Sequence, residues 1–314
     1  MNVLGSIYGS GVRVRNALYD RGTFARKTLR RPVVSVGNLS LGGAGKTPFV
    51  LLLGELLKAR GIGFDILSRG YGRKSQGVKL VDPGGSSAEF GDEPLLLARR
   101  LGVPVVVGED RAEAGKFAEQ RFQPQLHLLD DGFQHRALSR SFDIVLVTPE
   151  DARDRLLPAG RLREPLASLS RADAVVLASG ASAESFPVDG KLVWRVRRGI
   201  LPNDVPSRPV AFCGIARPKN FFLQLRTAGI EPAAEAVYRD HHAYGEKDIH
   251  DLLQLRQQSE ADGFVTTEKD AINLGTWMPA LNPIAIVPVK MELIDAANAV
   301  DTMLRVIAER TRQS

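Results

Sequence analysis

The sequence contains a single cysteine, Cys213, in a chain of 314 residues. One thiol excludes an internal disulfide framework and a cysteine-rich metal site, and it suits a reducing compartment. No apolar run approaches the roughly 18 residues that span a bilayer, and the N-terminus lacks the apolar core of a secretory signal peptide. We therefore expect a cytoplasmic protein that is either soluble or bound to a membrane surface.

Aromatic residues are also scarce, at 6% of the chain, and no stretch interleaves them with basic residues as a single-strand nucleic-acid binder does. Lysine and arginine outnumber aspartate and glutamate by 42 to 36, which gives a net charge of +6. This balance favours an anionic partner, and a phosphorylated substrate or an anionic membrane fits better than nucleic acid. The apolar fraction of 44% is ordinary for a globular protein, and the length predicts about two domains.

The stretch from Val33 to Thr47 has the order strand, glycine-rich loop, helix start. Its glycines let backbone N–H groups approach a phosphate, and the free amides of the helix start add partial positive charge. A lysine then reaches the β- and γ-phosphates, and a threonine is placed to hold Mg²⁺. The usual pattern is changed at its first glycine, which is serine here. The predicted nucleotide-binding residues are Ser40, Leu41, Gly42, Gly43, Ala44, Gly45, Lys46 and Thr47.

A second phosphate-site signal lies at the end of the apolar stretch 126–129, where Asp130 and Asp131 follow. A strand that delivers an aspartate at its C-terminal end is the Walker B arrangement, which positions Mg²⁺ against the loop threonine. Two adjacent carboxylates repel each other unless a cation compensates them. The pattern predicts a magnesium site formed by Thr47, Asp130 and Asp131, although an Asp-Asp-Gly turn without metal has the same sequence.

Three further loops carry groups suited to phosphate or acid–base chemistry. One contains Arg163 and Glu164, which can serve a transferring phosphate and Mg²⁺ or can close the loop as a structural ion pair. The loop 68–74 carries three cations and can bind a phosphate or line a substrate cleft, or it can be a solvated turn. Asp240 and His241 follow a predicted strand, where they can move protons or be ordinary loop residues.

Asp92 stands two residues before Pro94 and just ahead of an apolar stretch. This order predicts the N-cap of a helix. A capping aspartate needs no catalytic role, so the local pattern leaves the function of Asp92 open.

Residues 1–31 combine apolar residues at roughly helical spacing with seven cations and one acid. This composition is typical of a basic amphipathic helix that lies on an anionic bilayer. A helix packed on the protein with a solvated basic face has the same pattern, and glycines at 5, 9 and 11 weaken the helix. The pattern leaves both alternatives open.

Strand and helix patterns alternate along the chain with no repeat or long linker. A first alternation runs to about residue 185, a strand is predicted at 191–197, and a second alternation covers 209–289. The stretch 295–309 has an amphipathic helical pattern. These patterns predict a two-domain α/β protein.

Seven motifs occur together and in order: SVGNLSLGGAGKTP (35–48), SRGYGR (68–73), GDEP (91–94), DDGFQHR (130–136), GRLREP (160–165), RDHHAY (239–244) and TTEKDA (266–271). On these motifs, and over nearly its whole length, the sequence resembles the tetraacyldisaccharide 4′-kinase family of bacteria with an outer membrane. The resemblance implies phosphorylation of the 4′-hydroxyl of tetraacyldisaccharide 1-phosphate to lipid IVA in lipid A biosynthesis. It also implies ATP and Mg²⁺ as cofactors and peripheral binding to the cytoplasmic face of the inner membrane.

The family resemblance also implies an architecture. We expect a P-loop NTPase-like α/β/α sandwich with a basic membrane-surface helix over residues 1–188. Residues 189–292 should form linker strands and a second, smaller α/β/α domain, and 293–314 a helix that packs back on the first domain.

The same resemblance implies roles for particular residues. Asp92 matches the base for the sugar hydroxyl, and His241 matches its partner across the interdomain cleft. The resemblance implies that Lys46 contacts the β- and γ-phosphates and that Arg163 contacts the transferring phosphate. It also implies that Glu164 belongs to the active site.

Two alternatives stay open beside these roles. His135 and His242 also lie in matching motifs and can replace His241 as the partner of the base. A nucleotide-dependent, membrane-associated switch that has no phosphoryl acceptor is the alternative function.

Overall fold

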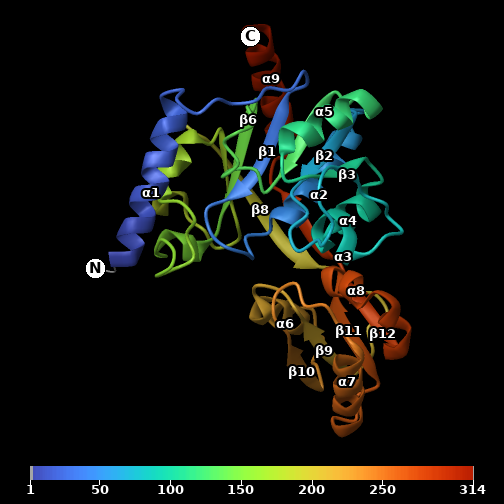
Figure 1. Ribbon diagram of the computed structural model, residues 1–314. Helices are drawn as coiled ribbons and strands as arrows, with labels where there is room; N and C mark the ends of the chain where they lie inside the picture. Colours follow the sequence, from blue (N-terminus) through green and yellow to red (C-terminus); the bar gives the residue numbers. More distant parts are fainter. Residues whose placement is uncertain (1–2, 314) are drawn as a thin grey trace.

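The computed structural model describes residues 3–313, whose strands form a nine-stranded and a four-stranded sheet (Figure 1). The large sheet has the order β13-β8-β7-β6-β1-β5-β2-β4-β3, and the small sheet has the order β10-β9-β11-β12. The strands are β1 (Val33–Asn38), β2 (Phe64–Ser68), β3 (Lys79–Leu80), β4 (Val105–Val107), β5 (Leu126–Asp130), β6 (Phe142–Val147), β7 (Ala174–Leu177), β8 (Leu192–Ile200), β9 (Pro209–Cys213), β10 (Ala234–Val237), β11 (Gly263–Thr267), β12 (Ile284–Val287) and β13 (Val289–Leu293). The α-helices are α1 (Val3–Asp20), α2 (Lys46–Lys58), α3 (Ser87–Phe90), α4 (Asp92–Leu101), α5 (Arg111–Phe122), α6 (Pro218–Thr227), α7 (Glu246–Gln258), α8 (Glu268–Leu274) and α9 (Ala296–Gln313). The predicted α/β class is confirmed.

The centre of the large sheet is parallel and covered on both faces, which is why its strands are apolar throughout. Successive residues of a strand point to opposite faces. Val34 and Val36 accordingly join the cluster under α2, α4 and α9, whereas Val33 joins the cluster under α5. The parallel register of β1 with β5 and β6 brings the C-terminal ends of these strands to one edge, where the phosphate loop begins.

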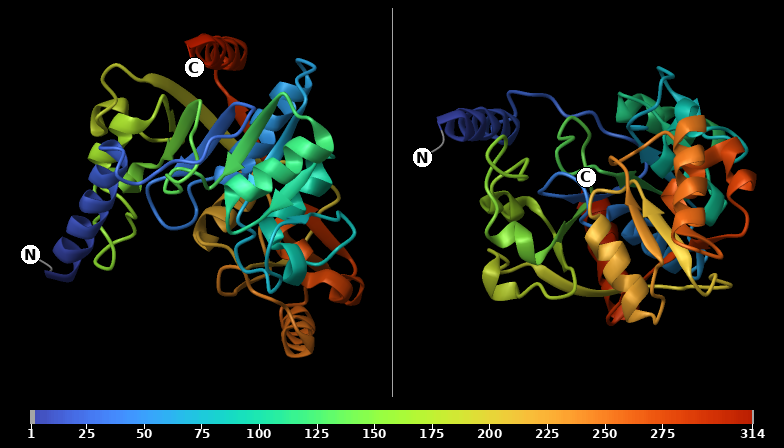
Figure 2. Two further views of the ribbon diagram at one scale, coloured as in Figure 1. Left: turned by 45° about the horizontal axis from the view of Figure 1, so that its top comes forward. Right: turned by 90° about the horizontal axis from the view of Figure 1, so that it is seen from below.

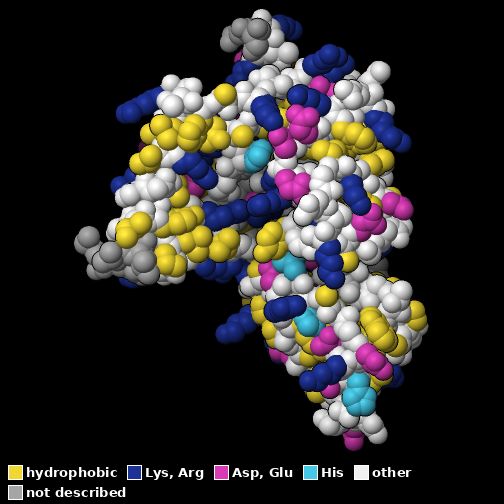
Figure 3. Space-filling view, in the orientation of Figure 1, with side chains coloured by type: hydrophobic (Ala, Val, Ile, Leu, Met, Phe, Trp, Pro, Cys, Tyr) yellow, Lys and Arg dark blue, Asp and Glu magenta, His cyan; other side chains and the backbone are white. Residues whose placement is uncertain are grey.

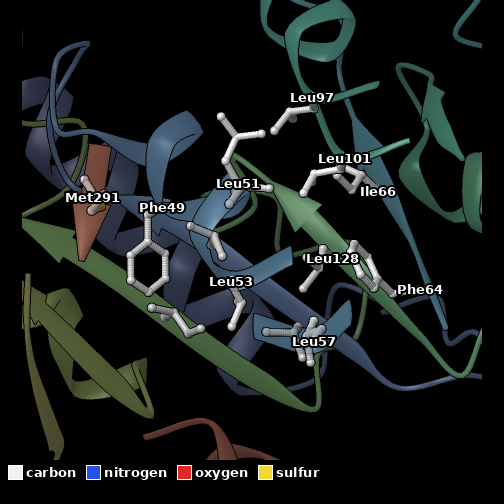
Figure 4. Close-up of a cluster of buried hydrophobic side chains, with 14 of the residues drawn as sticks. Phe49, Leu51, Leu53, Leu57, Phe64, Ile66, Leu97, Leu101, Leu128 and Met291 are labelled. Carbon is white, nitrogen blue, oxygen red and sulfur yellow. The ribbon is translucent and has the colours of Figure 1, made fainter. Parts of the chain in front are cut away.

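Helix α2 is anchored along its whole length. Phe49, Leu53 and Leu57 lie four residues apart on one face, are at most 1% exposed, and pack in one cluster with Ile66 and Leu128 (Figure 4). Burial of each such side chain contributes about 1.5–3 kcal/mol. The start of α2, where the phosphate loop joins it, is therefore held in a fixed position on the sheet.

The small sheet and helices α6, α7 and α8 form a second unit below the first in Figure 1. Its four strands are parallel, and two buried clusters lie on its two faces. Strands β8 and β13 connect the units and pair antiparallel, with Val289 opposite Ile200. The sequence predicted the first of these strands but not its place: β8 also pairs in parallel with β7, so both connecting strands extend the large sheet.

The C-terminal helix α9 returns to the first unit (Figure 2). Val300 and Met303 are fully buried in the main cluster. Arg310 binds Asp173 through both of its terminal nitrogens, at 2.7 and 3.0 Å. These contacts hold the C-terminal helix against the large sheet, although the second unit lies between them in the sequence.

Helix α1 stands at the side of the first unit (Figures 1 and 2). Its inner face includes Val12 and Asn16, both at most 9% exposed. Ile7 and Val14 are 64% and 60% exposed, which is unusual for two large apolar side chains on one helix. None of the helices in the described part of the chain is long and apolar enough to cross a bilayer.

Candidate active site

The phosphate loop between β1 and α2 has a backbone that glycine permits. Gly42, Gly43 and Gly45 have φ angles of 60°, 70° and 84°, which other residues rarely adopt. Gly45 is the N-cap of α2, and no described side chain caps this helix, so the N–H groups of its first turn can bind an anion. Ser40 is not among the positive-φ residues, so the usual first glycine is not needed there.

Four polar side chains meet beside this loop. The Nζ of Lys46 donates to Asn38 Oδ1 at 2.9 Å and lies 3.3 Å from Asp131 Oδ1. Arg163 binds both oxygens of Asp131, at 2.9 and 3.0 Å, and also donates to Asn38. Burial opposes the charge of Asp131, but Lys46 and Arg163 outweigh it and hold the pKa of Asp131 well below its usual range. Two cations thus lie where the phosphates of a nucleotide would enter.

Asp130 is the carboxylate that lacks such a cation. It is 2% exposed, its Oδ2 accepts from Ser68 at 3.3 Å, and its Oδ1 is buried without a hydrogen-bond partner among the described residues. Burial, together with Glu93 and Asp131, raises the pKa of Asp130 to about 7. A divalent cation at this point would supply the missing charge.

The residues beside the loop fit Mg²⁺ in the manner of phosphate-loop enzymes. Among the described residues no group of three or more His, Cys, Asp or Glu side chains could hold a metal ion. Mg²⁺ in nucleotide sites is held by one or two carboxylates, a hydroxyl, phosphates and water, so a protein cage is not required. Asp130 with its unpartnered oxygen, Asp131 and the loop residue Thr47, which is 8% exposed, provide such a set.

Asp92 and His241 meet across the two units. Nδ1 of His241 lies 2.9 and 3.0 Å from the two carboxylate oxygens of Asp92, and Asn273 donates to the same carboxylate at 3.1 Å. The predicted capping role of Asp92 is wrong. Gly91 is the N-cap of α4, and the Asp92 carboxylate accepts only the neighbouring Glu93 N–H of that helix, at 2.8 Å.

The backbone at His241 is unusual for its residue type. His241 has a φ of 58°, a left-handed value that costs a residue other than glycine about 1–3 kcal/mol. Its N–H donates to the carbonyl of Gly214 at 3.2 Å. Strained residues of this kind concentrate at functional sites, where the surrounding structure holds them.

Lys269 was not singled out from the sequence, yet it lies at the centre of this contact. Its Nζ is 3.1 Å from Nε2 of His241, 3.3 Å from Asp240 and 3.5 Å from Glu93. Burial opposes its charge, but Glu93, Asp92 and Asp240 raise the pKa of Lys269. Asp240 also approaches the phosphate loop, since its Oδ2 would lie 3.8 Å from a Cβ at residue 42. The same Asp240 oxygen is 3.8 Å from Nε2 of His241, so the Asp92–His241 pair lies near the loop.

We expect His241 to titrate above the ordinary histidine pKa of about 6.5. Burial opposes its charge, but the hydrogen bond and charge of Asp92 outweigh it and raise the pKa of His241. Burial likewise opposes the charge of Asp92, but His241 and Lys269 hold the pKa of Asp92 below its usual value. The pair therefore stabilises the fold from about pH 4 to 6.5, and this contribution is lost as the pH rises through the folded pKa of His241.

An NMR titration of the His241 ring checks the sign of both influences. Asp92→Asn should lower the pKa of His241, because it removes the carboxylate. Lys269→Met should raise it, because the lysine charge opposes protonation. A pKa that is the same in the wild type and in both variants would contradict the contact.

Glu164 is adjacent to Arg163 but turns away from the phosphate loop. It is fully buried, and its carboxylate accepts hydrogen bonds from Asn16 at 2.8 Å, Arg171 at 2.9 Å and Arg15 at 3.3 Å. In this structure the partners of Glu164 are α1 and Arg171, and its place in the active site stays a prediction. Its contacts are those of the structural ion pair that the sequence left as an alternative, and they tie α1 to the loop that carries Arg163.

The two alternatives to His241 lie elsewhere. Burial, with the charges of Arg111 and Arg140, lowers the pKa of His135 to about 4, so this ring is neutral at pH 7. His242 binds Asp248 within the second unit at 3.0 Å. Of the three histidines, His241 is the one whose ring contacts Asp92.

The cationic loop after β2 borders the same pair. It lines a cavity of about 300 Å³, formed by Arg69, Gly70, Tyr71, Gly72, Arg73 and Glu109. The ring of Tyr71 lies 5.2 Å from that of His241, centroid to centroid. Figure 3 shows this face hollowed between the two sides of the first unit, with lysine and arginine side chains in the hollow. A sugar phosphate bound there would meet positive charge.

The parallel centre of the large sheet carries a phosphate loop after β1 and an aspartate pair at the end of β5, and an acid–base pair lies near the loop. These features define a phosphate-loop enzyme of phosphoryl transfer. The family model for tetraacyldisaccharide-1-P 4′-kinase matches residues 1–308. The chain belongs to this family, as the sequence motifs had indicated.

Individual relatives agree over almost the whole length. The chain is 53% identical to a tetraacyldisaccharide 4′-kinase of Koribacter versatilis over 320 residues, which cover 99% of both chains. It is 40% identical to that of Geobacter metallireducens, over 93% of both. Its structure is similar to the crystal structure of the "apo" form of LpxK from Aquifex aeolicus in complex with ATP. That match has a TM-score of 0.78 and 36% identity, and it covers 97% of each chain.

Proposed function

We propose that the protein transfers the γ-phosphoryl group of ATP to the 4′-hydroxyl of tetraacyldisaccharide 1-phosphate at a membrane surface, giving lipid IVA. The observation that carries the proposal is the contact of Asp92 with His241 at 2.9 Å, near the phosphate loop. Family membership supports the acceptor, and the ATP in the Aquifex relative supports the donor.

On the donor side, the loop amides from Gly42 to Lys46 bind the β- and γ-phosphates. Lys46, whose Nζ lies 3.3 Å from Asp131 in this structure, turns to the β- and γ-phosphates when the nucleotide binds. Thr47 and the aspartate pair would hold Mg²⁺, which would neutralise part of the phosphate charge. Arg163 remains on Asp131 or turns its guanidinium to the transferring group, and in either position it offsets negative charge.

On the acceptor side, Asp92 orients the sugar hydroxyl and takes its proton late in the transfer, because a carboxylate is a weak base and a hydroxyl a weak acid. His241 holds the carboxylate in place and adds positive charge beside it. Asp92 is only 3% exposed here. The second unit must therefore move or His241 must release one oxygen before a hydroxyl can reach the base.

The test compares two acceptors in detergent micelles with ATP and Mg²⁺. We expect tetraacyldisaccharide 1-phosphate to be converted to a bisphosphorylated lipid that separates on thin-layer chromatography. The 4′-deoxy analogue should remain unchanged, since it lacks the attacking oxygen. Conversion of both lipids would contradict the 4′ assignment, and ATP hydrolysis with neither lipid changed would favour the nucleotide switch.

The membrane part of the proposal rests on α1. Ile7 and Val14 are exposed on α1, which also carries the exposed Arg13. Arg21 and Arg26 follow the helix and are exposed as well, and Arg26 donates to the Tyr19 carbonyl of α1 at 3.3 Å. Apolar side chains that enter the headgroup region and cations that meet anionic lipids are the two contributions that hold a helix on a bilayer.

We predict that the double variant Ile7→Glu with Val14→Glu no longer sediments with anionic vesicles, while its thermal unfolding is unchanged because both side chains are exposed. Leu223→Glu on α6, at a side chain that is 62% exposed, is the matched control and should bind as the wild type does. Binding of the double variant at wild-type level would return α1 to a purely structural role.

A further inference from the structure

A loop of the second unit lies against the phosphate loop of the first. It follows β9 and carries Ala216 and Arg217. A Cβ at Gly42 would lie 2.9 Å from Cβ of Ala216, and a Cβ at Gly43 would lie 2.8 Å from Cγ, Cδ and Nε of Arg217. The arginine stem thus lies directly over the part of the loop that faces a triphosphate.

The guanidinium of Arg217 is only weakly held in this position. It contacts Glu150 at 3.0 Å and Thr148 at 3.2 Å, and its buried Nε has no partner among the described residues. The Glu150 side chain is 59% exposed, whereas that of Arg217 is 14% exposed. An ion pair with so exposed a carboxylate contributes little, so the guanidinium can exchange it for a better anion.

A second arginine stands beside it. Arg198 makes no hydrogen bond or ion pair with a described side chain, and its Nε is also buried without a partner. It is opposite Met291 in the β8–β13 register, and Cε of Met291 lies 3.2 Å from a Cβ position at Gly45. Burial and the nearby charge of Arg217 both lower the pKa of Arg198. Two neighbouring cations at the loop lack a buried counter-charge.

We propose that Arg217, supported by Arg198, binds the polyphosphate chain of the nucleotide and neutralises the charge that develops during phosphoryl transfer. This proposal rests on the proposed kinase function. The bond from the γ-phosphorus to the β–γ bridging oxygen breaks, a bond to the sugar oxygen forms, and the hydroxyl proton goes to Asp92. Negative charge then collects on the departing ADP, next to Arg217. Since this arginine belongs to the second unit, the donor site is complete only when both units are together.

Three variants distinguish this role from a purely structural contact between the units. Arg217→Met keeps the stem on Gly43 but removes the charge, Arg217→Lys keeps a charge, and Glu150→Gln removes only the resting partner. Calorimetry gives the affinity for ATP with Mg²⁺, and single-turnover transfer to lipid gives the rate. We expect Arg217→Met to weaken ATP binding about 10-fold and to slow transfer about 10³-fold, with Arg217→Lys in between. Glu150→Gln should reduce neither.

Equal losses of ATP affinity and transfer rate in Arg217→Met and Glu150→Gln would overturn the inference and leave Arg217 with a structural role only. Wild-type behaviour of Arg217→Met would overturn it as well. Thermal unfolding without nucleotide shows whether each variant is folded, and Arg198→Met, with its smaller expected loss, provides a second test if Arg217→Met unfolds. Lys46→Ala in the same assay tests the phosphate loop itself. If Lys46→Ala loses transfer and Arg217→Met does not, the inference fails while the proposed function stands.

Discussion

Replacement of Lys46 by alanine is expected to reduce phosphoryl transfer by about 10³-fold or more. Nζ of Lys46 is 3.3 Å from Asp131 and 2.9 Å from Asn38, at the start of a helix whose first amides are free. The substitution removes the cation that reaches the β- and γ-phosphates. It also leaves Asp131 with Arg163 as its remaining ion-pair partner.

The measurement is the rate of lipid phosphorylation at saturating ATP, together with thermal unfolding. Lys58→Ala is the matched control, because Lys58 lies on the same helix and donates only to the Leu101 carbonyl, at 2.8 Å. We expect this control to phosphorylate lipid as the wild type does. A Lys46→Ala rate within tenfold of the wild type would remove the phosphate loop from the mechanism.

Asp92→Asn is expected to lower the transfer rate by about 10²–10⁴-fold. The amide keeps the size of the carboxylate and can still contact His241, but it cannot take the proton of the sugar hydroxyl. His241→Asn should also slow the reaction. The double variant should lose less than the product of the two single losses, because the two residues act as one unit.

Glu268→Gln is the control for the Asp92 experiment. Glu268 forms an ion pair with Arg100 across the same two units but has no contact with Asp92. Its loss should leave the transfer rate near that of the wild type, and a rate equal to that of Asp92→Asn would mean that both variants act through docking of the units. Full activity of Asp92→Asn would limit Asp92 to its contacts with His241 and Asn273.

The parts of the site that the sequence predicts are those formed by local backbone. The loop from Ser40 to Thr47 joins β1 to α2, and three of its glycines have left-handed φ angles, which fits the permissive backbone expected of a phosphate loop. Asp130 is at the end of a buried strand that pairs with β1, so the parallel register alone brings it to the loop.

The Asp92–His241 contact could not be derived from spacing, because 149 residues separate the two side chains and the contact depends on how the second unit sits on the first. The family resemblance pointed to the pair, whereas local pattern favoured a helix cap for Asp92. Lys269 and Arg217 were missed for the same reason. Arg217 lies in the loop between β9 and α6, and Lys269 lies in the first turn of α8. The TTEKDA motif contains Lys269, but the role of this lysine depends on Asp92 and Glu93 of the first unit.

Arg163 and Glu164 show that neighbouring residues of one motif can have separate partners. It follows Arg163 directly, and both side chains are ionic, so the sequence treats them alike. The structure sends Arg163 to Asp131 and Glu164 to Asn16 on α1. The chain bends at both residues, so their side chains take different directions, and the packing of α1 gives Glu164 its partners.

The most direct test follows the γ-phosphate itself. ATP labelled on that phosphate is incubated with the protein, Mg²⁺ and tetraacyldisaccharide 1-phosphate in detergent micelles, and the label is counted in the lipid and in inorganic phosphate. We expect label to enter the lipid and ADP to form only as fast as lipid is phosphorylated. Label that appears in inorganic phosphate at a rate unaffected by the lipid, with none in the lipid, would contradict the proposed function.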